Sequence, residues 1–134
     1  MEGIIATRGG AIVARETGRG IGPALKLYKE GRLKGCDVAD HIVGRAAAAL
    51  FIAGGAVRVQ ADVMSRGAAD FLVSAGLSAD AETLVDVIVN RKGTGVCPME
   101  TAVEGLTDPL EMIAAIERTL ASLVKFTFIP DFQG

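Results

Sequence analysis

The stretch GRAAAALFIAGGAVRVQADVMSRGAADFLVSAGL, residues 44–77, decides the fold. It holds the second half of a helix predicted over residues 36–55, a strand predicted over 56–64 and a helix predicted over 65–76. Apolar residues alternate along 56–64, which is the period of a strand, and Ser65 stands where the next helix needs a cap. A helix, a strand and a helix in close succession are typical of α/β domains.

The flanking segments add further strands and helices. Gly9-Gly10 lies between two short apolar runs and predicts a hairpin. Three prolines stand where a first helical residue is expected: Pro23, Pro98 and Pro109. Two more strands are predicted, one over 83–89 that is buried on both faces and one over 124–129. Because strands and helices alternate, we predict one α/β domain over residues 1–134, a three-layer α/β/α sandwich with a mixed sheet covered on both faces.

Composition excludes several classes of protein. The 134 residues carry a net charge of −2, and the basic residues are scattered, so nucleic acid is not an expected partner. The longest apolar run, residues 46–53, is far shorter than the ~20 residues that span a bilayer, and the N-terminus lacks a signal segment, so no membrane partner is expected. Two cysteines do not make a disulfide framework, and free thiols suit a cytoplasmic protein.

Several segments carry a resemblance to a known fold. VGRAAA (residues 43–48), VMS (63–65) and NRKGTGVCPME (90–100) are similar to segments of a family of uncharacterised bacterial and archaeal proteins with a cytidine deaminase-like fold. The resemblance covers nearly the whole chain. It implies that fold, with a helix, strand, helix and strand at its centre and a pocket of nucleotide size.

The zinc motifs of the deaminases are absent in this resemblance. Gly44 stands in place of the histidine ligand, Ala46 in place of the proton-shuttling glutamate, and Ser65 and Ala68 in place of the two cysteines. The resemblance therefore implies a deaminase scaffold without zinc, and zinc deaminase activity is not expected. Tetrahedral zinc needs three or four ligands at matched spacing, and Cys36, His41 and Cys97 are spread through the chain, so we predict no metal site and no cofactor.

The predicted helix 36–55 presents a candidate ligand face. Spacings of three and four residues place Asp37, His41, Gly44 and Arg45 on one side of it. An arginine at the start of a buried apolar run needs an anionic partner, which is either a ligand phosphate or, as we favour, a carboxylate of the chain itself. Gly44 inside a helix suggests close approach of a ligand or a neighbouring helix. The candidate carboxylates are Asp40, Asp62 and Asp86.

Ser65 has two interpretations. Its hydroxyl caps the helix that follows, or the same helix start binds an anion with help from Arg66. We favour capping.

The segment 90–100 is a second candidate ligand segment. Gly93, Thr94 and Gly95 allow close approach of the backbone to a ligand, and the neighbouring Arg91 and Lys92 suit a phosphate. Its spacing differs from the Walker pattern, so the phosphate signal is weak. A third glycine-rich segment, residues 17–23, is interpreted as a flexible connection.

Cys97 and Glu100 follow at the start of the helix that Pro98 opens. Cys97 is at the cap position and Glu100 three residues on, a spacing in which Glu100 binds the N–H of Cys97 as in a capping box. Cys97 is a pocket-lining thiol, a structural cap or a nucleophile, and His41 is the one imidazole that could serve it as a base.

Three hypotheses of function follow. The preferred one is a non-catalytic or diverged deaminase-like domain that binds a nucleotide or related phosphorylated small molecule. The second is a metal-independent transferase or hydrolase that uses Cys97 or Glu100. The third is a structural or regulatory homo-oligomer that pairs through the predicted strand at 124–129.

Overall fold

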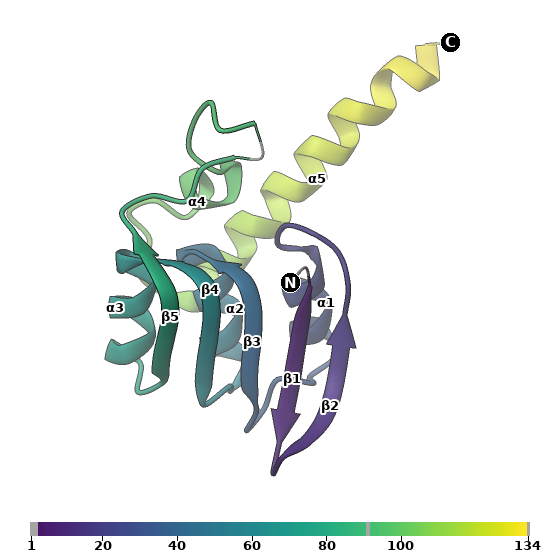
Figure 1. Ribbon diagram of the computed structural model, residues 1–134. Coiled ribbons are helices and arrows are strands. Elements are labelled where there is room, and N and C mark those ends of the chain that lie inside the picture. Colours follow the sequence, from purple (N-terminus) through teal and green to yellow (C-terminus); the bar gives the residue numbers. More distant parts are fainter. Residues whose placement is uncertain (1–2, 91, 134) are drawn as a thin grey trace.

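The computed structural model describes the backbone of residues 3–90 and 92–133 and the side chains of that part up to Leu123. The architecture is α/β, with a five-stranded mixed sheet and flanking helices (Figure 1). In chain order the elements are β1 (Ile4–Arg8), β2 (Ala11–Glu16), α1 (Gly22–Lys29), β3 (Asp37–Val43), α2 (Arg45–Gly54), β4 (Arg58–Ser65), α3 (Arg66–Ser74), β5 (Ser78–Val85), α4 (Pro98–Ala102) and α5 (Pro109–Gln133).

The strand order is β2-β1-β3-β4-β5. β1 pairs antiparallel with β2 and β3, whereas β3, β4 and β5 run parallel. The predicted hairpin is confirmed: Gly9 and Gly10 connect β1 to β2 with φ of 61° and 82°, a region that glycine enters without steric cost. The parallel half places the carboxyl ends of β3, β4 and β5 at one edge of the sheet.

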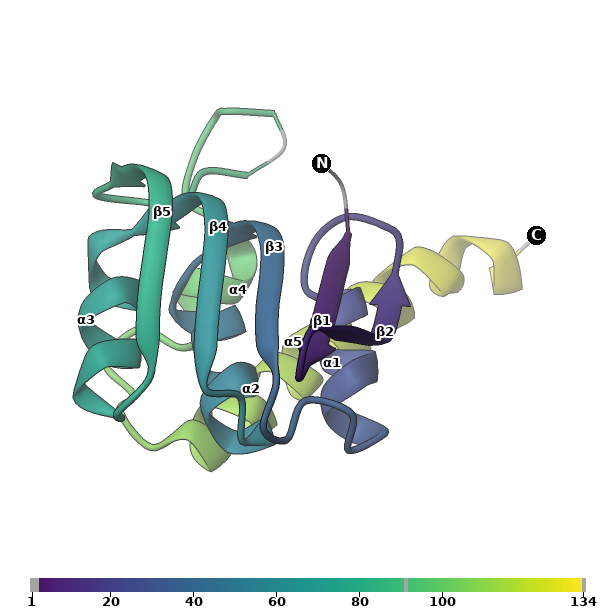
Figure 2. The same cartoon turned by 60° about the horizontal axis from the view of Figure 1, so that its bottom comes forward.

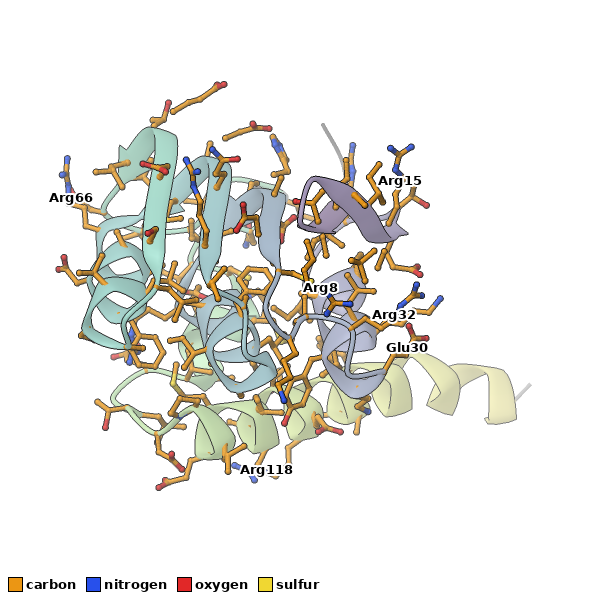
Figure 3. The ribbon with its side chains drawn as sticks, turned by 90° about the horizontal axis from the view of Figure 1, so that it is seen from below. Arg8, Arg15, Glu30, Arg32, Arg66 and Arg118 are labelled. Carbon is orange, nitrogen blue, oxygen red and sulfur yellow. The ribbon has the colours of Figure 1, made fainter. Side chains whose placement is uncertain are left out.

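The helices all lie on one face of the sheet (Figures 1 and 2). α1, α2 and α3 form a layer against the strands, and α5 packs beneath α2, so that the layers are sheet, helices and α5 (Figure 3). The prediction of helices on both faces is therefore wrong. The physical reason is in the strand pattern: Val59 is buried against the helices, while its neighbours Arg58 and Gln60 are exposed on the opposite face, which offers little apolar surface for a helix.

The predicted helix over residues 36–55 is wrong in its first half. Asp37–Val43 is β3, a central strand between β1 and β4, and the helix α2 begins only after Gly44. Aspartate, valine, isoleucine and histidine are weak helix formers, whereas the alanines after Arg45 are strong ones, so the local preferences agree with this boundary. Asp37 is consequently a strand residue.

The centre of the helical layer is confirmed as apolar. Every residue of α2 from Ala46 to Phe51 is buried, and Phe51 is fully enclosed. α2 packs against α1, α3 and α5. Because it has neighbours on every side, it carries apolar residues on every side.

Two predicted strands are misplaced. The strand expected over 83–89 is β5, Ser78–Val85; it lies at the sheet edge with Thr83 and Leu84 exposed, so it is not buried on both faces. The strand expected over 124–129 is wrong, because α5 is a 25-residue helix that continues through that segment. The alternation of apolar residues there covers only three positions, which is too short to separate a strand from a helix.

Among the helices of the described part, none is sufficiently long and apolar to span a bilayer.

Candidate functional site

A cavity of about 1080 Å³ opens at the carboxyl end of β3. This is the end of a parallel sheet at which ligands of α/β proteins commonly bind. Its walls come from the β2–α1 connection, the end of β3, the start of α2, the segment after β5 and the start of α4. In Figure 1 the loop that precedes α4, and α4 itself, lie above the upper ends of β3 and β4, and the β2–α1 connection lies to their right.

The cavity gathers half of the predicted site residues. Those that line it are His41, Gly44, Thr94, Cys97 and Glu100. The other five do not line it: Asp37, Arg45, Ser65, Gly93 and Gly95. Asp37 begins β3, so the length of the strand separates it from the cavity, and the predicted common face of Asp37, His41, Gly44 and Arg45 is wrong because a strand and a helix meet at Gly44.

Glu100 caps α2. One carboxylate oxygen accepts the N–H of Arg45 at 2.7 Å and the other accepts the N–H of Ala46 at 2.9 Å. These are the first two N–H groups of α2, which lack partners within the helix and point along the positive end of its dipole. The predicted capping box, with Glu100 bound to the N–H of Cys97, is therefore wrong: that N–H donates to the Ile88 carbonyl.

Gly44 makes this approach sterically allowed. A Cβ at residue 44 would lie 2.5 Å from each oxygen of Glu100. The backbone of Gly44 is extended, at φ −105° and ψ −171°, so glycine is required here for space and not for an unusual dihedral angle. The predicted close approach at Gly44 is therefore made by a side chain of the same protein.

Arg45 does not line the cavity, and its guanidinium binds the backbone that follows α4. Its guanidinium donates to the carbonyl oxygens of Val103, at 3.2 Å, and of Leu106, and it stacks over Phe71 at 5.4 Å. The anionic partner expected for Arg45 is therefore wrong, since backbone carbonyls and an aromatic ring satisfy the charge.

Ser65 caps α3, as we favoured from the sequence. It is buried, and its Oγ accepts the N–H of Ala68 at 3.0 Å. α2 and α3 begin side by side, because a Cβ at Gly67 would lie 3.3 Å from Cδ of Arg45. Arg45, the first residue of α2, therefore lies against the start of α3. Within the described part of the chain, no three His, Cys, Asp or Glu residues are grouped so as to hold a metal ion.

Two hydrogen bonds join Asn90 and Thr94 in the loop before α4. Asn90 Oδ1 accepts the N–H of Thr94 at 3.1 Å, and Asn90 Nδ2 donates to Thr94 Oγ1 at 3.2 Å. Gly93 turns the chain with φ of 71°, and Lys92 and Thr94 line the cavity. Arg91 lies outside the described residues. Lys92 and Thr94 therefore bring a cation and a hydroxyl to the cavity.

Cys97 is a cavity residue at the start of α4. Its thiol is half-buried and makes no capping hydrogen bond, although the residue is at the cap position. Of the alternatives left open by the sequence, the side-chain cap is excluded, and Cys97 lines the cavity. Cys36, by contrast, is fully buried in the core.

Sequence reasoning missed Asp40 as a cavity residue. Its Oδ1 accepts the N–H of His41 at 2.8 Å, and the carboxyl lines the cavity wall. Burial raises the pKa of Asp40 to about 6, the bonded N–H and the charge of His41 oppose that shift, and the charge of Asp62 adds to it. A polar residue inside a central strand was the available signal, but it was hidden by the helix prediction.

His41 joins the cavity to the open face of the sheet. Its Nδ1 donates to Asp62 Oδ2 at 2.8 Å, and this hydrogen bond lowers the pKa of Asp62. The imidazole is thereby oriented by a carboxylate of the neighbouring strand β4. Arg19, Gly18 and Gly20 of the β2–α1 connection also line the cavity, so that the segment interpreted as a plain connection is part of the site.

Known proteins relate to this chain as follows. Residues 2–120 match the TM1506 family, described as a domain of unknown function (DUF1893). The crystal structure of a DUF1893 family protein (TM1506) from Thermotoga maritima is similar, with a TM-score of 0.79 and 26% identity over 86% of this chain and 78% of that one. No curated protein matches. Because the family match extends over most of the chain, this protein belongs to the DUF1893 (TM1506) family.

Proposed function

We propose that this chain is a diverged, deaminase-like domain that binds a nucleotide or a related phosphorylated small molecule in the cavity at the end of β3. The observation that carries the proposal is one cavity of about 1080 Å³ bordered by two glycine-containing loops, each of which contributes a cation. Small-molecule sites are commonly apolar clefts of roughly 300–1,000 Å³ with a few polar groups. This volume therefore accommodates a ligand of nucleotide size.

The deaminase-like part of the proposal is supported by topology. α2, β4, α3 and β5 follow one another as the helix, strand, helix and strand that the resemblance requires. The starts of α2 and α3 lie together, as two halves of one site would. The residues at these starts are small, or are engaged in capping and bracing, and accordingly we propose a binding module and not a zinc deaminase.

The proposed phosphate contacts are Arg19 and Lys92. Arg19 lies between Gly18 and Gly20, and Lys92 precedes Gly93, so each cation is carried by a turn whose backbone can come close to a ligand. Both side chains line the cavity and are exposed. We also propose that the protein acts in the cytoplasm, since its two cysteines are free thiols.

The experiment is calorimetric titration with AMP, ADP, ribose 5-phosphate and inorganic phosphate. Lys92→Ala is expected to weaken all phosphorylated ligands that bind by roughly 10-fold, since charge-assisted hydrogen bonds are worth about 1.5–3 kcal/mol. Arg118→Ala is the matched control, because Arg118 is exposed on α5 at the far side of the molecule (Figure 3). Absence of binding by every probe, or equal weakening by both variants, contradicts the proposal.

A metal-independent enzyme remains the second candidate, and the position of Cys97 favours it. The half-buried thiol faces the cavity without a capping role. Glu100 is less suited to such chemistry, since both of its oxygens are bound by α2. Turnover of a phosphorylated probe that is abolished by Cys97→Ser would favour this candidate over the binding module.

A further inference from the structure

Asp40 is a residue of the cavity wall whose carboxyl group has a hydrogen-bond partner for only one of its two oxygens in the described part of the chain. One oxygen accepts the N–H of His41, and within the described part of the chain the other has no hydrogen bond or ion pair. That oxygen is not enclosed by protein, because no buried side-chain polar atom of the described part lacks a partner. It therefore has some exposed surface, and Asp40 is one of the residues that line the cavity.

The surrounding charges do not neutralise Asp40. His41, on the same strand, donates a hydrogen bond from Nδ1 to Asp62 of β4. Glu100 of α4 is bound to α2, and Cys97, Arg19 and Lys92 reach the cavity from other segments of the chain. A carboxyl that is largely buried without a cation is costly, and the raised pKa of Asp40, about 6, expresses that cost. At neutral pH most molecules still carry the ionised form.

The lining of the cavity carries groups of both charges. Arg19 and Lys92 supply cations from the two loops, while Asp40 and Glu100 supply carboxyls from the ends of β3 and α4. A phosphate is repelled by the carboxyls and attracted by the loops. The group that fits beside Asp40 is instead an O–H or N–H donor, because an ionised carboxylate only accepts hydrogen bonds.

We propose that Asp40 is a ligand-binding residue that accepts hydrogen bonds from hydroxyl or amino groups at the end of the ligand opposite its phosphate. The inference rests on the proposed function and deepens it: the ligand is a phosphorylated molecule with a donor-bearing end, such as the sugar hydroxyls or the base amino group of a nucleotide. Asp40 selects that end, and the loops hold the phosphate.

The test compares wild type, Asp40→Asn and Asp37→Asn by calorimetry at pH 7.5. Asp37 is the matched control, an exposed aspartate at the opposite end of the same strand. The probes are AMP, 2′,3′-dideoxyadenosine 5′-monophosphate, ribose 5-phosphate and inorganic phosphate. Asp40→Asn is expected to lose about 10-fold or more in affinity for donor-bearing probes and little for inorganic phosphate. Loss confined to AMP and ribose 5-phosphate assigns the hydroxyls, and loss confined to the two adenosine compounds assigns the amino group.

Affinities that are equal in Asp40→Asn and Asp37→Asn overturn the inference while leaving the phosphate site intact, since Lys92→Ala reports on that site separately. Failure of every probe to bind wild type overturns the proposed function, and this inference with it. A pH series gives a second reading that needs no variant to fold: for wild type, the affinity ratio of AMP to methyl phosphate, two monoesters whose phosphates ionise over a similar pH range, should fall by several-fold from pH 7.5 to pH 5. A constant ratio contradicts the inference.

Discussion

Glu100 occupies the space that a Cβ on Gly44 would need. Its two carboxylate oxygens bind the N–H groups of Arg45 and Ala46, and a methyl group at residue 44 would come within 2.5 Å of both. The two residues are 56 positions apart in the chain, yet each explains the other: the glycine admits the carboxylate, and the carboxylate gives α2 the side-chain cap that Gly44 itself lacks.

Gly44 and Glu100 should be energetically coupled. Gly44→Ala forces the carboxylate from its place and is expected to cost about 1–3 kcal/mol of unfolding free energy, while Glu100→Ala removes the cap and costs about 1–2 kcal/mol. In the double variant the added methyl group no longer meets Glu100, so the two costs should fall short of their sum by more than ~0.5 kcal/mol. Urea unfolding of the four proteins measures this.

The control for that cycle is Gly22→Ala. A Cβ there would meet nothing within 4 Å, and its φ is not positive, so stability should change by less than ~0.5 kcal/mol. Strict additivity of Gly44→Ala and Glu100→Ala would contradict the proposed contact.

Arg45→Lys should loosen α4 although it keeps the positive charge. A single ammonium group does not reproduce the fork that reaches the carbonyls of Val103 and Leu106 or the stacking over Phe71. We expect a loss of about 1–2 kcal/mol in urea unfolding. Amide hydrogen exchange should accelerate over residues 98–106 and not in α1, and Arg118→Lys should change neither quantity.

Asp40 should make the protein less stable as pH rises. Because its pKa rises from 3.8 to about 6 on folding, its contribution to stability is complete below 3.8 and is lost as pH rises through 6. Two pKa units correspond to ~3 kcal/mol, an upper figure for this change. Asp40→Asn does not ionise, so it should be more stable than wild type at pH 7.5 by ~1–3 kcal/mol.

The difference should shrink toward zero near pH 4. Asp62 acts with the opposite sign, since its lowered pKa gives stability above 3.8 that is lost as pH falls further, so the comparison is made above pH 4. Thermal unfolding of Asp40→Asn and Asp37→Asn at both pH values is the measurement. A difference for Asp40→Asn that is independent of pH would refute the assignment.

Alkylation of the native protein should modify one cysteine. Cys97 is half-buried in the cavity wall, whereas Cys36 has no exposed surface. Iodoacetamide should therefore add one group, seen by mass spectrometry, which is lost in Cys97→Ser and retained in Cys36→Ser. A probe that occupies the cavity should slow the reaction. Equal labelling of both thiols would show that the core around Cys36 opens readily.

Local signals predicted well the elements that local chemistry decides. The Gly9-Gly10 turn, the Ser65 cap and the proline at the start of α4 were all identified in the sequence. β3 was missed because a central strand owes its existence to neighbours far along the chain, and a run such as 37–43 has no strict alternation of its own. Likewise, no residue near Glu100 in the sequence indicates that its hydrogen-bond partners lie at the start of α2.

The site was half predicted for the same reason. Residues on loops and helix starts, such as Thr94 and Cys97, were found because glycines and prolines mark those places. Arg45 is a candidate ligand contact in the sequence because a charge beside an apolar run has no evident partner there. Only the folded chain brings the carbonyl oxygens that bind its guanidinium. Asp40 was considered only as a counter-ion because its strand was taken for a helix.

A helix of five residues, such as α4, is too short to persist by itself. Here it is anchored from two sides by the beginning of α2, through Glu100 and through the guanidinium that reaches the backbone after it. The position of Cys97 therefore depends on the start of α2 as well as on Ile88, whose carbonyl accepts the N–H of Cys97. A change of side chain at Lys92 or Thr94 would alter the lining of the cavity without removing any of the contacts that anchor α4.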